Sequence, residues 1–183
     1  MRNISGLFDN YDEARLAVYG LEEVGIPADD ISIISLNKTR RDSEDDSSTK
    51  AASVGAAVGG VGGLLAGLAA FAIPGVGQVL GAGWVATAFI GAAAGGVAGG
   101  LIGSLVDGGI DESDAHVFDE GVKRGGALVT ARVEESEYGS AAAVLKGLHP
   151  VDVATRRREY EQTGWAGFLV EDIWDSDIGN EDK

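Results

Sequence analysis

Several of the residues on which protein chemistry most often depends are absent or scarce in this chain of 183 residues. There is no cysteine, which excludes disulfides, thiolate metal sites, iron–sulfur clusters and cysteine nucleophiles. There are two histidines, His116 and His149, which leave little material for a histidine metal site or a histidine-based triad. The sequence therefore predicts a protein that is not an enzyme and that has no metal and no cofactor.

Basic residues are also in short supply. The 14 lysines and arginines are outnumbered by 29 aspartates and glutamates, which gives a formal net charge of −15. A nucleic-acid binder needs a basic face that neutralises phosphates, whereas an acidic surface repels them. We therefore expect no nucleic-acid partner.

Charge is missing altogether from one long internal stretch. Every charged residue lies within residues 1–50 or 107–183, so residues 51–106 contain none, and we call them the uncharged segment. A helix on the surface of a soluble domain normally has a charged outer face. The segment also holds 16 of the 29 glycines, which would cost on the order of 10 kcal/mol in unsupported helices. Lipid, close helix packing or a partner subunit must therefore offset this loss of helix stability.

The two parts that flank this segment have the pattern of alternating strands and helices. Apolar runs that predict strands alternate there with apolar residues at helical spacing. Because a β-α-β pattern occurs twice, the predicted fold class is α+β: a ferredoxin-like βαβ-βαβ domain with two helices on one face of a four-stranded antiparallel sheet. The predicted elements are a strand over Asn3–Phe8, a helix around Ala14–Val24, a strand over Ile31–Leu36, a helix over Asp111–Arg124, a strand over Ala127–Val133, a helix over Ser136–Leu148 and a last strand over Val151–Thr155.

This interpretation divides the chain into five parts. They are the first βαβ half (1–36), an acidic polar linker (37–50), the uncharged segment (51–106), the second half (107–155) and an acidic tail that contains tryptophan (156–183). Disordered tails are usually poor in aromatic residues. Trp165, Phe168 and Trp174 are therefore candidate interface anchors, or else they cover the domain's own sheet.

Glycines recur at intervals of four within the uncharged segment. Residues four apart on a helix lie on one face, so each set would form a stripe without side chains along which another backbone can approach closely. The two sets are Gly55, Gly59, Gly63 and Gly67, and Gly91, Gly95, Gly99 and Gly103. The segment is thus predicted to be a Gly/Ala-rich helical hairpin, a glycine zipper, inserted between the second and third strands. Its turn is assigned to Pro74, Gly75 and Gly77, because proline and glycine interrupt helices.

Two environments could hold such a hairpin. Its arms, 51–73 and 85–106, are each long enough to cross a bilayer, which needs about 20 residues. Basic residues on both sides, including Lys50 and Lys123, would then place the flanking parts in the cytoplasm. The alternative is a cytoplasmic homo-oligomer in which the hairpins pack together without lipid.

Other motifs favour ordinary structural roles. No lysine follows a glycine cluster as a phosphate-binding loop requires. Asp111, Glu112 and Asp114 are well explained as acids at a helix start, and His116 as a solvated histidine. The run Arg156–Arg158 is interpreted as a solvated charge run, with contact to anionic lipid as the alternative.

The order of several short motifs resembles a known family. Gly6-Leu7-Phe8-Asp9, Gly25-Ile26-Pro27, Ile73-Pro74-Gly75-Val76-Gly77 and the run from Gly121 to Thr130 are similar to the bacterial general stress protein 17M-like family. That family is related to heat-induced stress proteins and includes uncharacterised membrane proteins. The resemblance covers roughly residues 3–155 and implies a non-enzymatic stress protein without catalytic residues.

The sequence thus predicts a non-enzymatic general stress protein that self-associates through a glycine-zipper hairpin at or in the cytoplasmic membrane. A soluble cytoplasmic homo-oligomer is the alternative. A small-ligand-binding regulatory domain is the third hypothesis, and it rests on fold analogy alone.

Overall fold

The computed structural model describes residues 1–36, 69–73, 77–88 and 100–167. In these residues a five-stranded sheet has the order β1-β5-β2-β4-β3, and every neighbouring pair is antiparallel. The strands are β1 (Arg2–Phe8), β2 (Ile31–Leu36), β3 (Ala69–Ile73), β4 (Gly77–Ala82) and β5 (Ala127–Val133). The longer helices are α1 (Tyr11–Glu23), α4 (Gly100–Asp107), α5 (Glu112–Lys123), α6 (Tyr138–Gly147) and α7 (Val153–Gln162). The predicted α+β class is confirmed.

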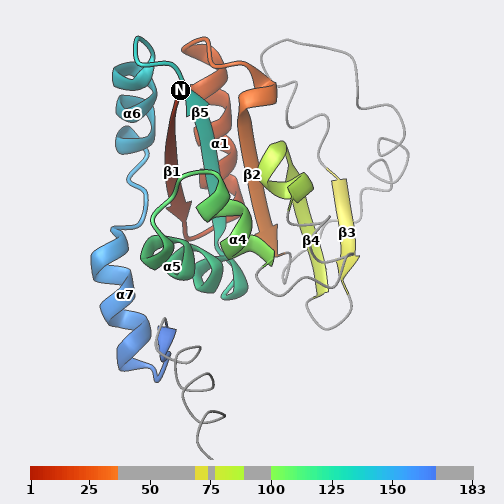
Figure 1. Ribbon diagram of the computed structural model, residues 1–183, viewed down its shortest axis with the longest axis vertical. Coiled ribbons are helices and arrows are strands. Elements are labelled where there is room, and N and C mark those ends of the chain that lie inside the picture. Colours follow the sequence, from red (N-terminus) through yellow and green to blue (C-terminus); the bar gives the residue numbers. More distant parts are fainter. Residues whose placement is uncertain (37–68, 74–76, 89–99, 168–183) are drawn as a thin grey trace, which may run out of the picture.

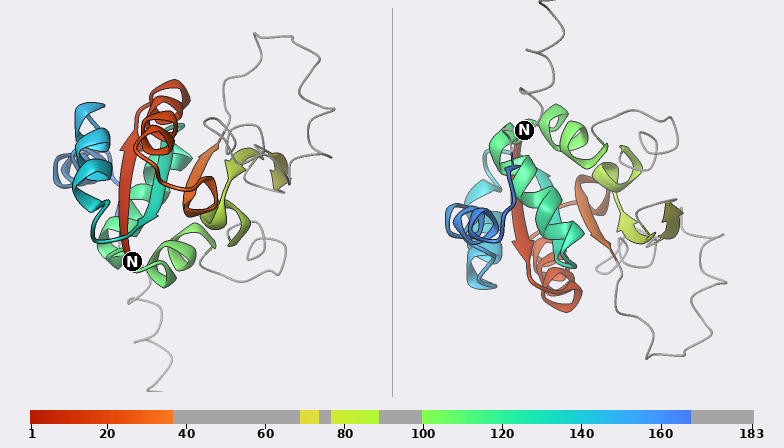
Figure 2. Two further views of the ribbon diagram at one scale, coloured as in Figure 1. Left: turned by 90° about the horizontal axis from the view of Figure 1, so that it is seen from above. Right: turned by 90° about the horizontal axis from the view of Figure 1, so that it is seen from below.

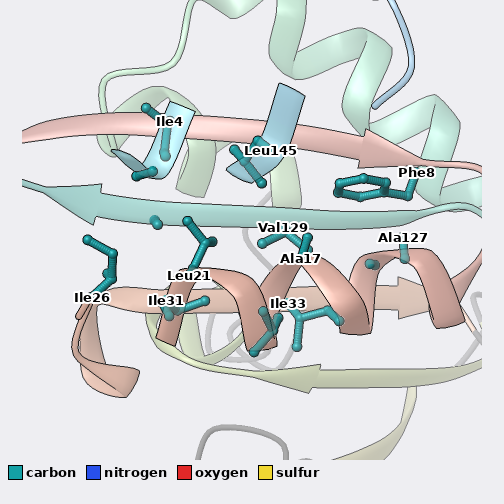
Figure 3. Close-up of a cluster of buried hydrophobic side chains, with 14 of the residues drawn as sticks. Ile4, Phe8, Ala17, Leu21, Ile26, Ile31, Ile33, Ala127, Val129 and Leu145 are labelled. Carbon is teal, nitrogen blue, oxygen red and sulfur yellow. The ribbon is translucent and has the colours of Figure 1, made fainter. Parts of the chain in front are cut away.

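Helices cover both faces of the sheet (Figures 1 and 2). On one face α1 and α6 close over a core to which the alternate residues of β5 contribute, among them Ala127 and Val129 (Figure 3). On the other face α4 and α5 close over Leu7, Ile34 and Leu128. Because successive residues of a strand point to opposite faces, a strand buried on both sides must be apolar at nearly every position. β2 and β5 satisfy this with Ile, Leu, Val and Ala, and with three buried hydroxyl residues, Ser32, Ser35 and Thr130.

Local signals account for the first β-α-β unit. The Asn10 side chain accepts a hydrogen bond from the Glu13 backbone N–H at 2.9 Å and so begins α1, and Asp12 and Glu13 lie in its first turn, where the helix dipole favours negative charge. Gly25 follows the helix with φ +98°, a conformation that glycine adopts without strain. In the last turn of α1, Gly20 lies where an added Cβ would come within 2.7 Å of the Val144 side chain, so a glycine is needed for α1 and α6 to approach this closely.

The predicted last strand over Val151–Thr155 is wrong. Only its first residue makes a strand-like contact, because the Val151 N–H donates to the Leu7 carbonyl oxygen at 2.8 Å beside β1. Asp152 then accepts a hydrogen bond from the Thr155 backbone N–H at 2.8 Å and begins α7. Branched residues at positions 151, 153 and 155 favour a strand, but the N-cap and the helix-favouring run that follows it dominate.

The predicted helical hairpin also needs correction. The part of its first arm that the structure describes, Ala69–Ile73, is strand β3, and β4 begins at Gly77 and pairs back onto it. Glycine has low helix propensity, and Phe71, Ile73 and Val79 favour strands, so pairing into the sheet is the better way to satisfy this backbone. The second arm contains a short helical stretch at 84–88 and helix α4, and its residues 89–99 lie outside the described part. Among the residues that the structure describes, we find no helix with the length and hydropathy needed to cross a bilayer.

Candidate functional site

The titratable groups of the described residues do not assemble into a reactive centre. No group of three or more potential metal-ligating side chains occurs in this part of the chain. The Ser113 side chain and backbone N–H donate to Asp111 and hold the pKa of that carboxyl below its usual range. Thr155 lowers the pKa of Asp152 in the same way. Both carboxylates are therefore accounted for as helix N-caps.

Two arginines near the start of α7, Arg156 and Arg157, form ion pairs with acidic residues of the same chain. Arg156 contacts Asp9 at 2.8 Å and Glu159 at 2.9 Å, and the hydrogen bond from its guanidinium to Asp9 raises the pKa of the arginine. Arg157 contacts Asp114 on α5 at 2.9 Å. These ion pairs connect α7 to the β1–α1 loop and to α5.

The beginning of the tail folds back on α7. Tyr160 is buried, and its ring lies under the Arg124 guanidinium, 4.3 Å from ring centroid to Cζ. Trp165 meets the same ring edge-on at 5.8 Å between centroids, and its backbone N–H donates to the Tyr160 carbonyl oxygen. Of the three predicted interface anchors, Trp165 thus packs on its own domain, whereas Phe168 and Trp174 lie outside the described residues.

The uncharged segment joins the domain through β4. Four residues of β4, from Val79 to Ala82, pair with β2, and the buried Ser32 hydroxyl donates to the Ala82 carbonyl oxygen at 2.9 Å. The same hydroxyl accepts from the Ala86 backbone N–H at 3.3 Å. Ser32 therefore satisfies the backbone on both sides of the bend at which β4 ends. In this way the segment becomes part of the sheet.

Gly83 makes that bend possible. Its φ is +88°, a conformation that favours glycine, and an added Cβ would overlap the Ile31 carbonyl oxygen and come within 2.7 Å of the Ser32 Cα. Both of those neighbours are backbone atoms in a fully buried part of β2. A residue with a side chain at position 83 would therefore push β4 away from β2.

Trp84 lies next to the bend and joins three elements. Its half-buried ring lies 5.2 Å from the Arg132 guanidinium of β5, and Arg132 contacts Asp30 at 2.9 Å. An added Cβ on Gly108, just after α4, would meet the same ring at 2.5 Å. The buried indole Nε1 has no hydrogen-bond partner in the described part of the chain. Trp84, Gly83 and Ser32 are not among the site residues predicted from sequence, although Gly81-Ala82-Gly83-Trp84 at the end of an apolar run is a signal for such a bend.

Of the eight glycines in the two predicted stripes, Gly103 lies in the described part of the chain. Gly103 lies in α4, and nothing described lies within 4 Å of the place where its Cβ would be. The buried side of α4 is formed instead by Leu101 and Leu105. The other stripe glycines, and Pro74 and Gly75 of the predicted turn, lie outside the described residues: Gly55, Gly59, Gly63, Gly67, Gly91, Gly95 and Gly99. Gly77 is the first residue of β4 and pairs with Ile73, so the turn falls between strands.

The two outer strands of the described sheet, β1 and β3, differ in the charged residues and contacts that they carry. At β1, Arg2 contacts Glu135 at 3.3 Å and stacks on the Tyr138 ring at 3.9 Å, and the Val151 N–H bonds to Leu7. Charges and backbone contacts of this kind prevent a further strand from adding to an edge. At the other side of the described sheet stands β3, which has neither charge nor proline.

Residues 3–78 match the family model of the heat induced stress protein YflT domain. No curated protein and no solved structure matches the chain. The matched range includes β1, α1, β2 and β3, and so combines the first β-α-β unit with the first strand of the uncharged segment. The match supports a general stress protein family and suggests a general stress-response role.

Proposed function

We propose that the protein is a non-enzymatic general stress protein that acts by self-association through its uncharged segment. The observation that carries the proposal is the complete lack of charge over residues 51–106 in a chain of net charge −15. Repulsion between copies is weakest where no charges lie, and like charges on the rest of the surface oppose other contacts. The match to a heat-induced stress protein domain supports the stress-response part of the proposal.

We further infer that the core is a variant of the ferredoxin-like fold. The neighbouring strands β1, β5 and β2 and the pairing of α1 and α6 on one face support this. The single hydrogen bond from Val151 to Leu7 takes the place beside β1 where a fourth strand of that fold would lie. The uncharged segment is then an insertion that adds β4 and β3 beyond β2.

The association can take place in either of two settings. Pairing of β4 with β2 supports association of copies without lipid, because the segment is held to the rest of the domain by its backbone. The absence of charge over residues 51–106 supports the other setting, in which the segment contacts the cytoplasmic membrane and the charged parts face the cytoplasm.

One set of measurements tests the function and separates its settings. The native protein should be larger than its monomer mass of 18.7 kDa when sized by light scattering after gentle lysis. A carbonate wash of the membrane fraction should leave lipid-inserted protein in the pellet and release a soluble oligomer. A monomer in the supernatant, with and without detergent, would refute self-association.

The contribution of the glycine stripes is tested separately. Gly59→Leu and Gly95→Leu place bulk in the proposed stripes and should reduce the mass of the assembly. Gly139→Leu is the control, because Gly139 lies in α6 outside the uncharged segment and no described atom lies within 4 Å of its Cβ position. Equal masses for all three variants and the wild type would show that the stripes do not mediate association.

A further inference from the structure

The outer edge of β3 has the properties of a site for adding a strand. β3 is the terminal strand of the described sheet, and among the described residues no strand pairs with its outer side. A terminal strand presents backbone N–H and C=O groups that can pair with another chain, and proteins commonly block this with lysine, proline or a bulge. β3 has the sequence Ala-Ala-Phe-Ala-Ile, and its neighbour β4 has no charge either.

The contrast with β1 makes this feature specific. The β1 edge carries an ion pair of Arg2 with Glu135, a cation–π contact with Tyr138 and a backbone hydrogen bond from Val151. The same sheet thus has one outer strand that carries a charged residue and accepts a backbone hydrogen bond from Val151, and one outer strand that has no charged residue and no proline.

We propose that β3 pairs antiparallel with β3 of a second copy of this chain, so that two sheets join into one across a two-fold axis at Phe71. This rests on the proposed self-association and names its partner and surface. The middle of the five-residue strand is the register that pairs the most residues, and it places Ala70 opposite Ala72 of the second copy. On both sides of the axis an alanine then pairs with an alanine, and residue 71 pairs with residue 71 of the second copy.

A second copy suits this edge better than a different protein. Two uncharged strands can meet without desolvating a charge, whereas the remainder of each chain carries the entire net charge of −15. Because the same patch serves both subunits, the contact closes on itself and gives a dimer, not a filament. Salt screens the repulsion between the two acidic subunits, so the dimer should become tighter as ionic strength rises.

Cysteine pairing tests the register, because the wild-type chain has no cysteine to interfere. Ala70→Cys and Ala72→Cys chains are prepared separately, mixed and oxidised. In the proposed register residues 70 and 72 of different chains are directly opposite, at a Cα separation of about 4.5–5.5 Å, which a disulfide can span. The mixture should give a covalent dimer of the two different chains in higher yield than either chain alone. Thr87→Cys, exposed and within the uncharged segment, is the control for random collision.

The outcomes separate this inference from the proposed function. Covalent dimers in the mixture alone support edge pairing in this register. Equal yields in the mixture, in the single chains and in the Thr87→Cys control would overturn it, and so would a strictly monomeric wild-type chain at high salt. If light scattering shows an assembly that Gly59→Leu disrupts while the mixed cysteines fail to pair, self-association stands and the β3 edge does not mediate it. If the protein is monomeric in every condition, both proposals fail.

Discussion

Three glycines allow the packing of the uncharged segment to be tested by one kind of substitution. Gly103 is helical, and no described atom lies within 4 Å of the position of an added Cβ. Gly125 has φ +105°, and no described atom lies within 4 Å of its Cβ position either. Gly83 has φ +88°, and an added Cβ there would overlap backbone atoms of β2. An alanine at each site thus adds the same methyl group to a different environment. The three variants separate the effect of helix propensity from backbone strain and from steric overlap.

The structure sets the expected order of the three effects. Gly103→Ala should stabilise the protein by up to about 1 kcal/mol, the difference in helix propensity. Gly125→Ala should destabilise it by about 1–2 kcal/mol, the cost of a left-handed conformation for a residue with a Cβ. Gly83→Ala combines that cost with an overlap on the Ile31 carbonyl, which cannot move because Ile31 is buried and paired with Ala131, so a loss of about 2–5 kcal/mol is expected.

Urea unfolding monitored by circular dichroism measures these differences. With a slope of about 1–3 kcal/mol per molar urea, shifts of this size move the midpoint by several tenths of a molar or more. The slopes of the three variants should agree with the wild type, so that midpoints can be compared directly. If Gly83→Ala were no more destabilising than Gly125→Ala, the described bend at the end of β4 would be wrong. If Gly103→Ala were destabilising, Gly103 would have to pack closely on another backbone, as a glycine stripe requires.

Three further predictions concern the folded domain. Leu21→Ala empties a fully buried position in the α1 core and should cost about 2–5 kcal/mol in urea unfolding, and a loss below 1 kcal/mol would contradict the packing in Figure 3. The pKa of Asp152 is lowered from 3.8 by its hydrogen bonds to Thr155, so the ionised carboxylate stabilises the fold above that pH, and this stabilisation is lost as the pH falls through and below it. Asp152→Asn keeps a capping oxygen but cannot ionise, so its stability should lack this part of the acid dependence. Identical plots of unfolding midpoint against pH for the variant and the wild type would refute the assignment. Tyr160→Leu should free Trp165 and shift its fluorescence to longer wavelength, while an unchanged spectrum would show that Trp165 is held by other contacts.

The first β-α-β unit and β5 could be predicted from sequence because their signals are local. Ile31–Leu36 and Ala127–Val133 agree with the observed strands at every residue, and the first strand differs by one. Each is a branched apolar run that ends at a turn residue or a cap. Such signals act over a few residues and do not depend on the partner strand.

The uncharged segment could not be predicted in the same way. A run of alanine and glycine has little hydrophobic periodicity, and the four-residue glycine spacing that predicts a helix is equally compatible with a strand's period of two. The preference of Ala69–Ile73 for a strand is realised through pairing with β4, and β4 in turn depends on β2, more than 40 residues earlier in the chain. Contacts over such separations are not encoded in a short window. The same limit explains why Gly83 and Ser32, which join the segment to the sheet, were not recognised.

The distribution of charge connects the stability of the domain with its proposed association. Arg156 and Arg157 of α7 are engaged with Asp9, Asp114 and Glu159, so these cations hold the domain together while the surplus carboxylates leave its surface acidic. A surface of this kind keeps copies apart wherever charges are near. The described strands of the uncharged segment, β4 and β3, form one side of the sheet (Figure 2) and bring no charge of their own to it. Salt screens the repulsion between acidic copies and should therefore favour contact through this side. It also weakens the exposed ion pairs, but each of these contributes only about 0–1 kcal/mol to stability. Association can therefore strengthen at salt concentrations that leave the fold of each copy nearly unchanged.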